Sequence, residues 1–367
     1  MIARDCLPAL VRGCCSCNSK AKSGFMSSFS ETTSSKNRLC KSWGSPAHIL
    51  TTASPKAREI RSVVTKKIPP ISVRLIPTAE NPKTDSPFSR TEAIYLIHSL
   101  IDEQSRKMLR VLLCFDFAYG FPRDFSAALQ TATGKTDAAL PWLAAWQYLS
   151  EAIKDDVGTV LHRKPNNRSN RFDVANTINS LLSLSPEAPG PFWCASPEAA
   201  YSYIPQSRPQ QPFQTGQGFS IQPLRLTDQR ARSGTPFRLF GTASVGSQSL
   251  TGIPRLNHLR FDSMFATRSA IWPFETGWAT KAKWLPDHVS ILHAEIYPSA
   301  REPSPDLIKD RGRIRSMWEW ARDLDRQELL WFEFARPTEI DPGSPEDIAI
   351  QLTEGWILGS SPTVRHQ

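Results

Sequence analysis

The chain has 367 residues, of which 44 are Lys or Arg and 35 are Asp or Glu, for a net charge of +9 at pH 7. Residues 1–70 hold 12 of the basic and 3 of the acidic residues, so this segment accounts for the whole excess and the rest of the chain is neutral. A neutral body disfavours a nucleic-acid binder, which usually carries a basic face on its folded domain. No run reaches the roughly 18 apolar residues of a membrane-spanning helix, so we expect a cytoplasmic protein without a membrane partner.

Residues 1–70 differ from the rest of the chain in composition as well as charge. They are rich in Ser, Lys and Arg, contain most of the cysteines, and lack a sustained helix or strand periodicity, so we predict a disordered basic extension. The same composition is also typical of an organelle transit peptide. Because only Cys114 and Cys194 lie beyond it, the body is not a disulfide scaffold.

Residues 71–367 are predicted to form one α/β domain, and the first half alternates helices with a strand. Apolar residues recur at helical spacing over 90–107, and the apolar run 111–115 has the length of a buried strand. After a turn at Gly120-Phe121-Pro122, further helices are predicted over 123–131, 140–155 and 171–182, with a polar loop at 162–170.

The second half begins with residues 184–235, a Pro-, Ser- and Gln-rich stretch that we interpret as an irregular insertion or lid. Three short strands are then predicted over 236–240, 269–272 and 289–296, and helices over residues following 248 to about 259 and over 314–330. Strands that alternate with helices indicate an α/β layer fold, in which ligands bind at the carboxyl ends of the strands.

Four carboxylates follow predicted strands or begin a helix. Asp116 comes directly after strand 111–115, Glu295 lies where strand 289–296 runs out, Glu275 follows Trp272-Pro273, and Asp310 starts the last long helix. Mg²⁺ and Mn²⁺ prefer such oxygen ligands, and two ions together can promote phosphodiester cleavage. The alternative is structural, with Asp116 and Asp310 as turn or helix caps and Glu295 paired with a basic residue such as Arg301.

Two of these segments resemble a known family. The stretches Leu112 to Pro122 and His293 to Pro298 resemble a family of uncharacterised proteins with a predicted ribonuclease H-like fold and nuclease activity. In that family a strand delivers an Asp before a Pro-containing turn, and a later strand delivers a Glu before Tyr-Pro. The resemblance implies a mixed sheet flanked by helices, with Asp116, Glu295 and Asp310 as metal ligands and Glu275 as an accessory ligand or base.

Further segments resemble a bacterial subgroup of this family that carries cofactor-biosynthesis names, namely 167–172, 241–254 and 272–277. This chain departs from the family pattern in one feature. The family opens with a strand bearing a first acidic residue, whereas the corresponding segment His48 to Lys56 has no carboxylate and places His48 where an Asp is expected. A two-metal site that lacks its bridging acid would be impaired.

A small-residue loop between a predicted strand and helix is a candidate phosphate site. In it, Ser244, Gly246, Ser247 and Gln248 precede or begin the helix, where exposed backbone N–H groups can hold an anion. Arg168 and Arg171 lie in a dense polar segment before another helix, and arginine forks suit phosphate. The alternatives are a well-capped turn for the first and a solvated loop for the second.

The leading hypothesis from the sequence is a divergent ribonuclease H-like hydrolase of phosphate esters that uses Mg²⁺ or Mn²⁺, with nucleic acid or a nucleotide as its ligand. The first alternative is a non-catalytic nucleotide- or anion-binding protein on the same fold, favoured by the missing acid and the neutral body. The second is an enzyme or accessory factor that handles a phosphate-bearing cofactor, with residues 184–235 as a lid.

Overall fold

A computed structural model describes residues 90–134, 140–155, 169–196, 200–242, 244–306 and 309–360. The predicted extension 1–70, the His48 segment and Arg168 lie outside these ranges. Within them, no helix is long and apolar enough to cross a membrane.

The core of the fold is a small parallel sheet with β5 (Ile291–Ile296) at its centre. On one side β5 pairs with β1 (Val111–Phe115), and on the other with β4 (Ser269–Ile271) and, further along, with β6 (Ile357–Leu358). All these pairs are parallel, so within the described residues the prediction of a mixed sheet is wrong. Strands buried on both faces read as continuous apolar runs, which is the pattern of 111–115 and of most of 291–296.

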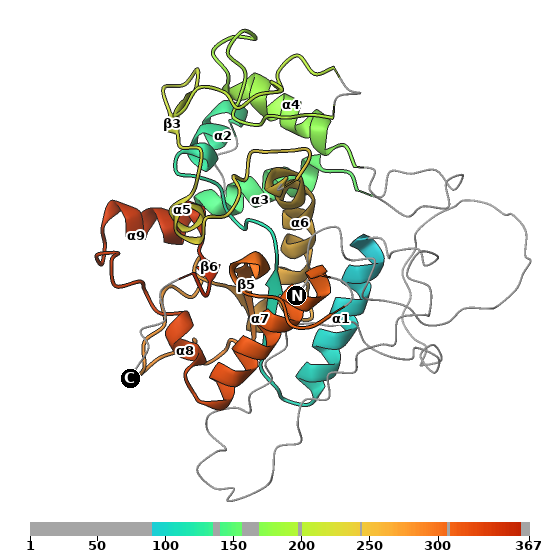
Figure 1. Cartoon of the computed structure of the whole chain (residues 1–367), viewed down its shortest axis with the longest axis vertical. Coiled ribbons are helices and arrows are strands. Elements are labelled where there is room, and N and C mark those ends of the chain that lie inside the picture. Colours follow the sequence, from blue (N-terminus) through green and yellow to red (C-terminus); the bar gives the residue numbers. More distant parts are fainter. Residues whose placement is uncertain are drawn as a thin grey trace, which may run out of the picture.

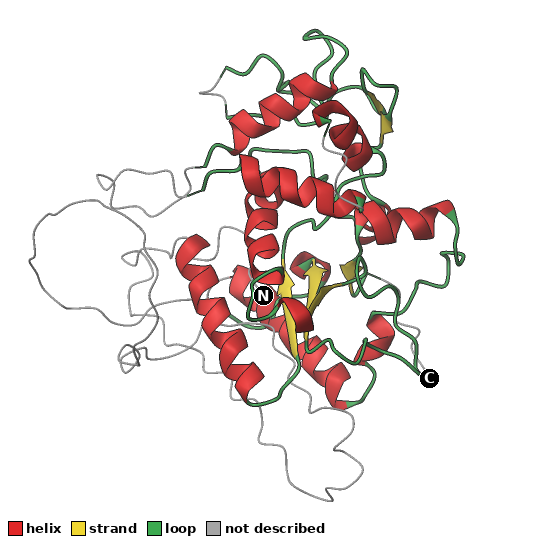
Figure 2. Ribbon diagram, turned by 180° about the vertical axis from the view of Figure 1, so that it is seen from behind, coloured by secondary structure: helices red, strands yellow, loops and turns green. Residues whose placement is uncertain are grey.

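Helices cover both faces of this sheet (Figure 2). Val111, Leu113 and Phe115 of β1 point into one apolar cluster, while Leu112 and Cys114 point into another. The first cluster is closed by helices α1 (Arg90–Arg106), α2 (Phe125–Thr133), α3 (Pro141–Ala152), α4 (Arg171–Leu182) and α6 (Val245–Arg260). The second is closed chiefly by α7 (Lys309–Arg326) and α8 (Leu330–Glu333).

The helices and the strand predicted up to residue 182 are confirmed, with no boundary more than three residues from its predicted position. The helix predicted over 314–330 begins earlier and forms α7, which places Asp310 in its first turn, as expected. The strand predicted over 236–240 is wrong, because this segment makes only an isolated bridge between Trp193 and Arg238.

The Pro-rich stretch 184–235 is mostly irregular, but it also contains a two-stranded hairpin and a short helix. The hairpin joins β2 (Phe213–Gln214) and β3 (Ser220–Ile221), and the helix is α5 (Leu226–Ala231). Several of its apolar side chains belong to the first cluster, among them the fully buried Phe192 and Ile221. The stretch therefore packs into the core, and Figure 1 shows β3 beside α2 and α4 at one end of the molecule.

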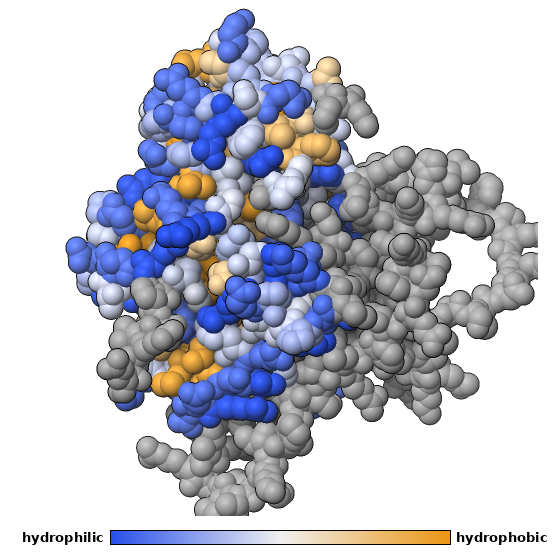
Figure 3. Space-filling model, in the orientation of Figure 1, coloured by the Kyte–Doolittle hydropathy of each residue, from blue (hydrophilic) through white to orange (hydrophobic). Residues whose placement is uncertain are grey.

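The C-terminal segment returns to the sheet. Helix α9 (Pro345–Ala349) continues into one π-helical turn, Ile350–Glu354, which leads into β6. Short 3₁₀ turns at Ala266–Arg268 and Pro298–Ala300 precede β4 and follow β5. The face drawn in Figure 3 is largely hydrophilic, with separate apolar patches, and large apolar side chains that are exposed are spread over several elements.

Candidate functional site

A pocket lies at the carboxyl ends of β1 and β5. The register pairs Phe115 with Glu295, so Asp116 leaves β1 beside the end of β5. Asp116, Glu295 and Gln248 line this pocket together with Arg225 and Asp228. Its free volume of about 10 Å³ has room for roughly one water-sized particle. A small-molecule site is usually about 300 Å³ or larger, so a nucleotide would meet only the mouth of this pocket.

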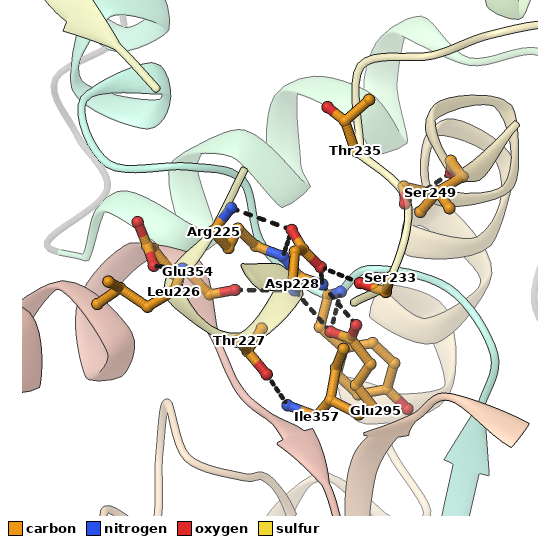
Figure 4. A network of polar contacts seen from close by, with 12 residues as sticks. Arg225, Leu226, Thr227, Asp228, Ser233, Thr235, Ser249, Glu295, Glu354 and Ile357 are labelled. Carbon is orange, nitrogen blue, oxygen red and sulfur yellow. Dashed lines mark hydrogen bonds and ion pairs between the residues drawn. The ribbon is translucent and has the colours of Figure 1, made fainter. Parts of the chain in front are cut away.

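The guanidinium of Arg225 occupies the centre of the site (Figure 4). Its Nη1 and Nη2 atoms donate to the Oε2 and Oε1 atoms of Glu295 at 2.7 and 2.6 Å. The Oε2 atom also accepts the backbone N–H of Tyr119 at 2.9 Å. The side chains of Arg225 and Glu295 are buried, with exposures of 1% and 4%. The orientation of the Glu295 carboxylate is fixed, because each of its oxygens has a defined donor.

Asp228 completes the coordination of the same guanidinium. Arg225 donates from Nε to Oδ2 at 2.9 Å and from Nη2 to Oδ1 at 2.7 Å. The backbone N–H of Arg225 also donates to Asp228 Oδ2, and the Ser233 hydroxyl donates to Oδ1. Asp228 lies in the first turn of α5, where a carboxylate that caps the helix start is favoured.

Glu354 extends this network to the C-terminal segment. Its carboxylate accepts the backbone N–H groups of Arg123 and Leu226 at 2.9 and 2.8 Å. Its backbone carbonyl accepts Nη1 of Arg225 at 3.0 Å. Four segments therefore meet at Arg225: the turn after β1, the start of α5, the end of β5 and the π-helical turn before β6. Figure 4 shows Asp228 and Glu295 beside Arg225, at the start of α5.

The charges of the network are unequal. Burial alone would lower the pKa of Arg225, but Asp228 and Glu295 raise it well above its ordinary value, so the guanidinium stays charged. Burial raises the pKa of Glu295, and Arg225 opposes that rise. Burial likewise raises the pKa of Glu354. One buried cation thus faces several carboxylates.

A hard divalent ion needs carboxylate oxygens with lone pairs that are free to coordinate it. Both oxygens of Glu295 already accept from Arg225, and Oε2 accepts a third hydrogen bond. Within the described part of the chain, no group of three or more His, Cys, Asp or Glu side chains is arranged to hold a metal. In this arrangement the residues do not fit a two-metal centre.

The other two predicted acids lie elsewhere. Glu275 follows β4, and both of its oxygens accept from Arg260, at 2.6 and 2.7 Å, while Oε2 also accepts the backbone N–H of Ile271. Asp310 lies in α7 and pairs with Arg313 at 3.2 Å. The expected meeting of all four carboxylates is therefore not found: the structure brings Asp116 and Glu295 together and gives Glu275 and Asp310 local arginine partners.

Part of the predicted phosphate loop packs against the backbone of residues 236–238. Ser244 is the residue before α6, and the N–H of Gly246 donates to the carbonyl of Arg238 at 2.9 Å. A Cβ on Gly246 would lie 2.7 Å from the carbonyl oxygens of both Pro236 and Arg238, so a glycine is required for close approach of the chain. The expectation that Gly246 presents its N–H to an anion is therefore wrong, because this N–H already donates to the carbonyl of Arg238.

Ser247, Arg171 and Gln248 have different positions. The Ser247 hydroxyl donates to the carbonyl of Leu239 and accepts Nε of Arg171 at 3.0 Å. Two residues predicted to hold phosphate are thus in contact, at the meeting point of α4 and α6. Gln248, the next residue, lines the pocket beside Asp116.

Sequence reasoning missed Arg225, Asp228, Glu354 and Tyr119, which hold Glu295 in place. The available signal was the segment Arg225-Leu226-Thr227-Asp228, in which an acid stands three residues after the residue that precedes a helix. That pattern predicts a helix cap, but it does not reveal that the arginine reaches a strand 70 residues away.

The neighbouring polar residue of β5, His293, is also buried. It is 0% exposed, and Ser269 of β4 lies 2.7 Å from its Nε2 atom. Burial, and then the charge of Arg260, lowers the pKa of His293 to about 3, so the ring is neutral at ordinary pH. We assign it a structural role between β4 and β5.

Comparisons of the chain with models of known families, with curated proteins and with solved structures find no match.

Proposed function

We propose that this protein binds a phosphate-bearing ligand without hydrolysing it, on a ribonuclease H-like fold in which Arg225 stands where a divalent cation would otherwise balance the strand-end acids. The observation that carries the proposal is the pair of hydrogen bonds from Arg225 to both oxygens of Glu295, at 2.7 and 2.6 Å. A guanidinium held in this way neutralises Glu295 and withholds its oxygens from a metal ion.

The support for the fold assignment is the arrangement of β1 and β5. They are adjacent and parallel, and their carboxyl ends bring Asp116 and Glu295 to one pocket. The family-like segments Leu112 to Pro122 and His293 to Pro298 supply these two strands and the turns after them. The absence of an acid in the segment that starts with His48 agrees with a site that has lost metal chemistry.

The support for a phosphate-bearing ligand lies at the start of α6. Arg171 bonds Ser247 at 3.0 Å, and Gln248 reaches the pocket mouth one residue later. Arginine forks and helix starts both suit phosphate oxygens. The ligand would rest on this surface, because the pocket itself holds only about one water-sized particle.

Calorimetry and cleavage assays on the whole chain test this proposal. Mg²⁺ and Mn²⁺ are expected to give no binding heat, and nucleoside phosphates are expected to bind equally well with and without a chelator. Labelled single- and double-stranded substrates are expected to remain intact. Metal-dependent cleavage that is lost in Asp116→Asn but kept in Asp102→Asn, a change on α1, would overturn the proposal.

That contrary outcome is the signature of the second candidate, a Mg²⁺- or Mn²⁺-dependent hydrolase of phosphate esters. The specific observation in its favour is the surplus of acid at the site: Asp116, Asp228 and Glu295 line a pocket with Arg225 as the basic lining residue. In this candidate Arg225 must release Glu295 before a metal binds. Arg225→Met would then increase metal affinity, whereas the first proposal expects no metal binding by either form.

A further inference from the structure

Trp193 is held at the surface by the core beneath it. Its neighbour Phe192 is fully buried, and the Trp193 backbone makes two hydrogen bonds to the segment 237–239. The N–H of Trp193 donates to the carbonyl of Phe237 at 3.1 Å, and the N–H of Leu239 donates to the carbonyl of Trp193 at 3.0 Å. The indole itself is partly exposed, so a fixed aromatic ring meets solvent.

Two guanidiniums lie against this indole. The Cζ atom of Arg238 is 5.3 Å from the ring centroid and that of Arg208 is 5.8 Å away. Neither arginine has a carboxylate partner among the described residues, and Nε of Arg238 is buried without a hydrogen-bond acceptor. Two of the arginines over other rings bond carboxylates: Arg260 over Phe261 bonds Glu275, and Arg322 over Trp318 bonds Asp323.

The uncompensated donors call for an anion. Arg208 is exposed, so its guanidinium N–H groups are open to the oxygens of a ligand. Guanidinium forks match phosphate, and an indole or a guanidinium plane stacks on a nucleobase. A surface that combines both groups therefore fits a ligand in which bases alternate with phosphates.

A second arginine–aromatic pair adjoins the first. Arg171 lies 4.6 Å over the ring of Phe172, which stacks with Tyr201 at a centroid distance of 6.2 Å. Arg171 also bonds Ser247, whose hydroxyl donates to the carbonyl of Leu239, the residue after Arg238. The two pairs are thus linked through Leu239, and together they offer contacts for more than one nucleotide.

From these contacts we infer that the surface formed by Trp193, Arg208, Arg238, Arg171 and Phe172 binds single-stranded nucleic acid. Phosphates lie on the guanidiniums, and a base lies against Trp193. An acidic peptide would satisfy the arginines but gains less from the aromatic rings. The inference rests on the proposed function only in requiring a phosphate-bearing ligand. It identifies that ligand as single-stranded nucleic acid and places its binding site outside the strand-end pocket.

Fluorescence anisotropy with a labelled oligothymidylate tests it, at about 50 and 200 mM salt so that phosphate contacts appear in the salt dependence. The double variant Arg208→Ala/Arg238→Ala is expected to bind about tenfold or more weakly and with a shallower salt slope. Trp193→Leu is expected to lose about tenfold in affinity, and Trp193→Phe much less, because Phe retains a stacking face.

Arg268→Ala is the matched control, since Arg268 also lies over an aromatic ring, 5.5 Å from the centroid of Phe265, on another part of the molecule. It is expected to bind like the unchanged protein. Should Arg238→Ala fail to fold, as shown by its thermal melt, Arg208→Ala alone tests the surface, because Arg208 is exposed. Unchanged affinity and salt slope in the arginine variants, or tighter binding of polyglutamate than of the oligonucleotide, would overturn the inference.

The same experiment separates this inference from the proposed function. Oligonucleotide binding that is unchanged in the Trp193, Arg208 and Arg238 variants but is lost in Gln248→Ala would place the ligand at α6 and refute only the Trp193 surface. Metal-dependent cleavage of the probe, lost in Asp116→Asn while the surface variants still weaken binding, would refute the non-hydrolytic function and leave the surface intact.

Discussion

Arg225 at the start of α5 and Glu295 at the end of β5, 70 residues apart, are joined by two hydrogen bonds at the carboxyl edge of the parallel sheet. The pair attaches the Pro-rich stretch to the central strand, and through the Glu354 carbonyl it also holds the C-terminal segment. Because a buried charge without a partner is costly, the pair constrains all three segments together.

Arg225→Met is expected to destabilise the protein by about 3–5 kcal/mol, because it leaves Glu295 and Asp228 buried without their cation. Chemical denaturation with urea measures the change. Arg106→Met is the control, since Arg106 forms only an exposed pair with Asp102 on α1 and is expected to contribute about 0–1 kcal/mol. A folded Arg225→Met protein of unchanged stability would show that Arg225 does not neutralise the site.

His293 is expected to make stability fall in acid. Its ordinary pKa is 6.5 and burial lowers it to about 3 in the folded protein, so its contribution is present above pH 6.5 and is lost as the pH falls toward 3. Over the full interval the effect is at most about 5 kcal/mol. Between these pH values the free energy of unfolding should change less with pH for His293→Gln than for the unchanged protein. The exposed control His258→Gln should keep the pH dependence of the unchanged protein.

Asp155 ties α1 and α6 to the end of α3. It accepts from Arg90 at 2.8 and 2.9 Å and from Arg255 at 3.3 Å. Burial alone would raise the pKa of Asp155, but the two arginines lower it below its ordinary 3.8. The stabilisation is therefore present above about pH 4 and is lost as the pH falls through the folded-state pKa.

Asp155→Asn is expected to cost about 1.5–3 kcal/mol at neutral pH, because hydrogen bonds to charged groups are lost. Hydrogen exchange should show faster opening of α1 in this variant. The exposed change Glu103→Gln, which removes only a pair with Lys107 at the end of α1, serves as the comparison. Equal protection of α1 in both variants would contradict the assigned role of Asp155.

Gly246→Ala tests whether the start of α6 is limited by packing. The added Cβ would meet two backbone carbonyl oxygens at 2.7 Å, and relieving such contacts costs about 1–3 kcal/mol. The helix preference of Ala returns at most about 1 kcal/mol, so a net loss of stability is expected. Gly216→Ala, whose nearest contact is 3.4 Å, should be close to neutral in the same thermal unfolding experiment. A more stable Gly246→Ala protein would contradict this packing role.

The sequence by itself determined the local elements of this protein. Apolar runs such as 111–115 and helical periodicity such as that of 90–107 report on side-chain burial along one segment, and both elements form where expected. The adjacency of Asp116 and Glu295 also followed from the sequence, because the carboxyl ends of parallel strands share one edge of a sheet.

Only the tertiary structure decided what those acids contact. Arg225 reaches Glu295 from a Pro-rich stretch with no periodicity, and Arg260 and Arg313 engage Glu275 and Asp310. An ion pair between distant segments leaves no pattern in either one, since any acid can be balanced by any arginine that the fold brings near. The charge of a site is therefore set by long-range packing, whereas the strands that present it are set locally.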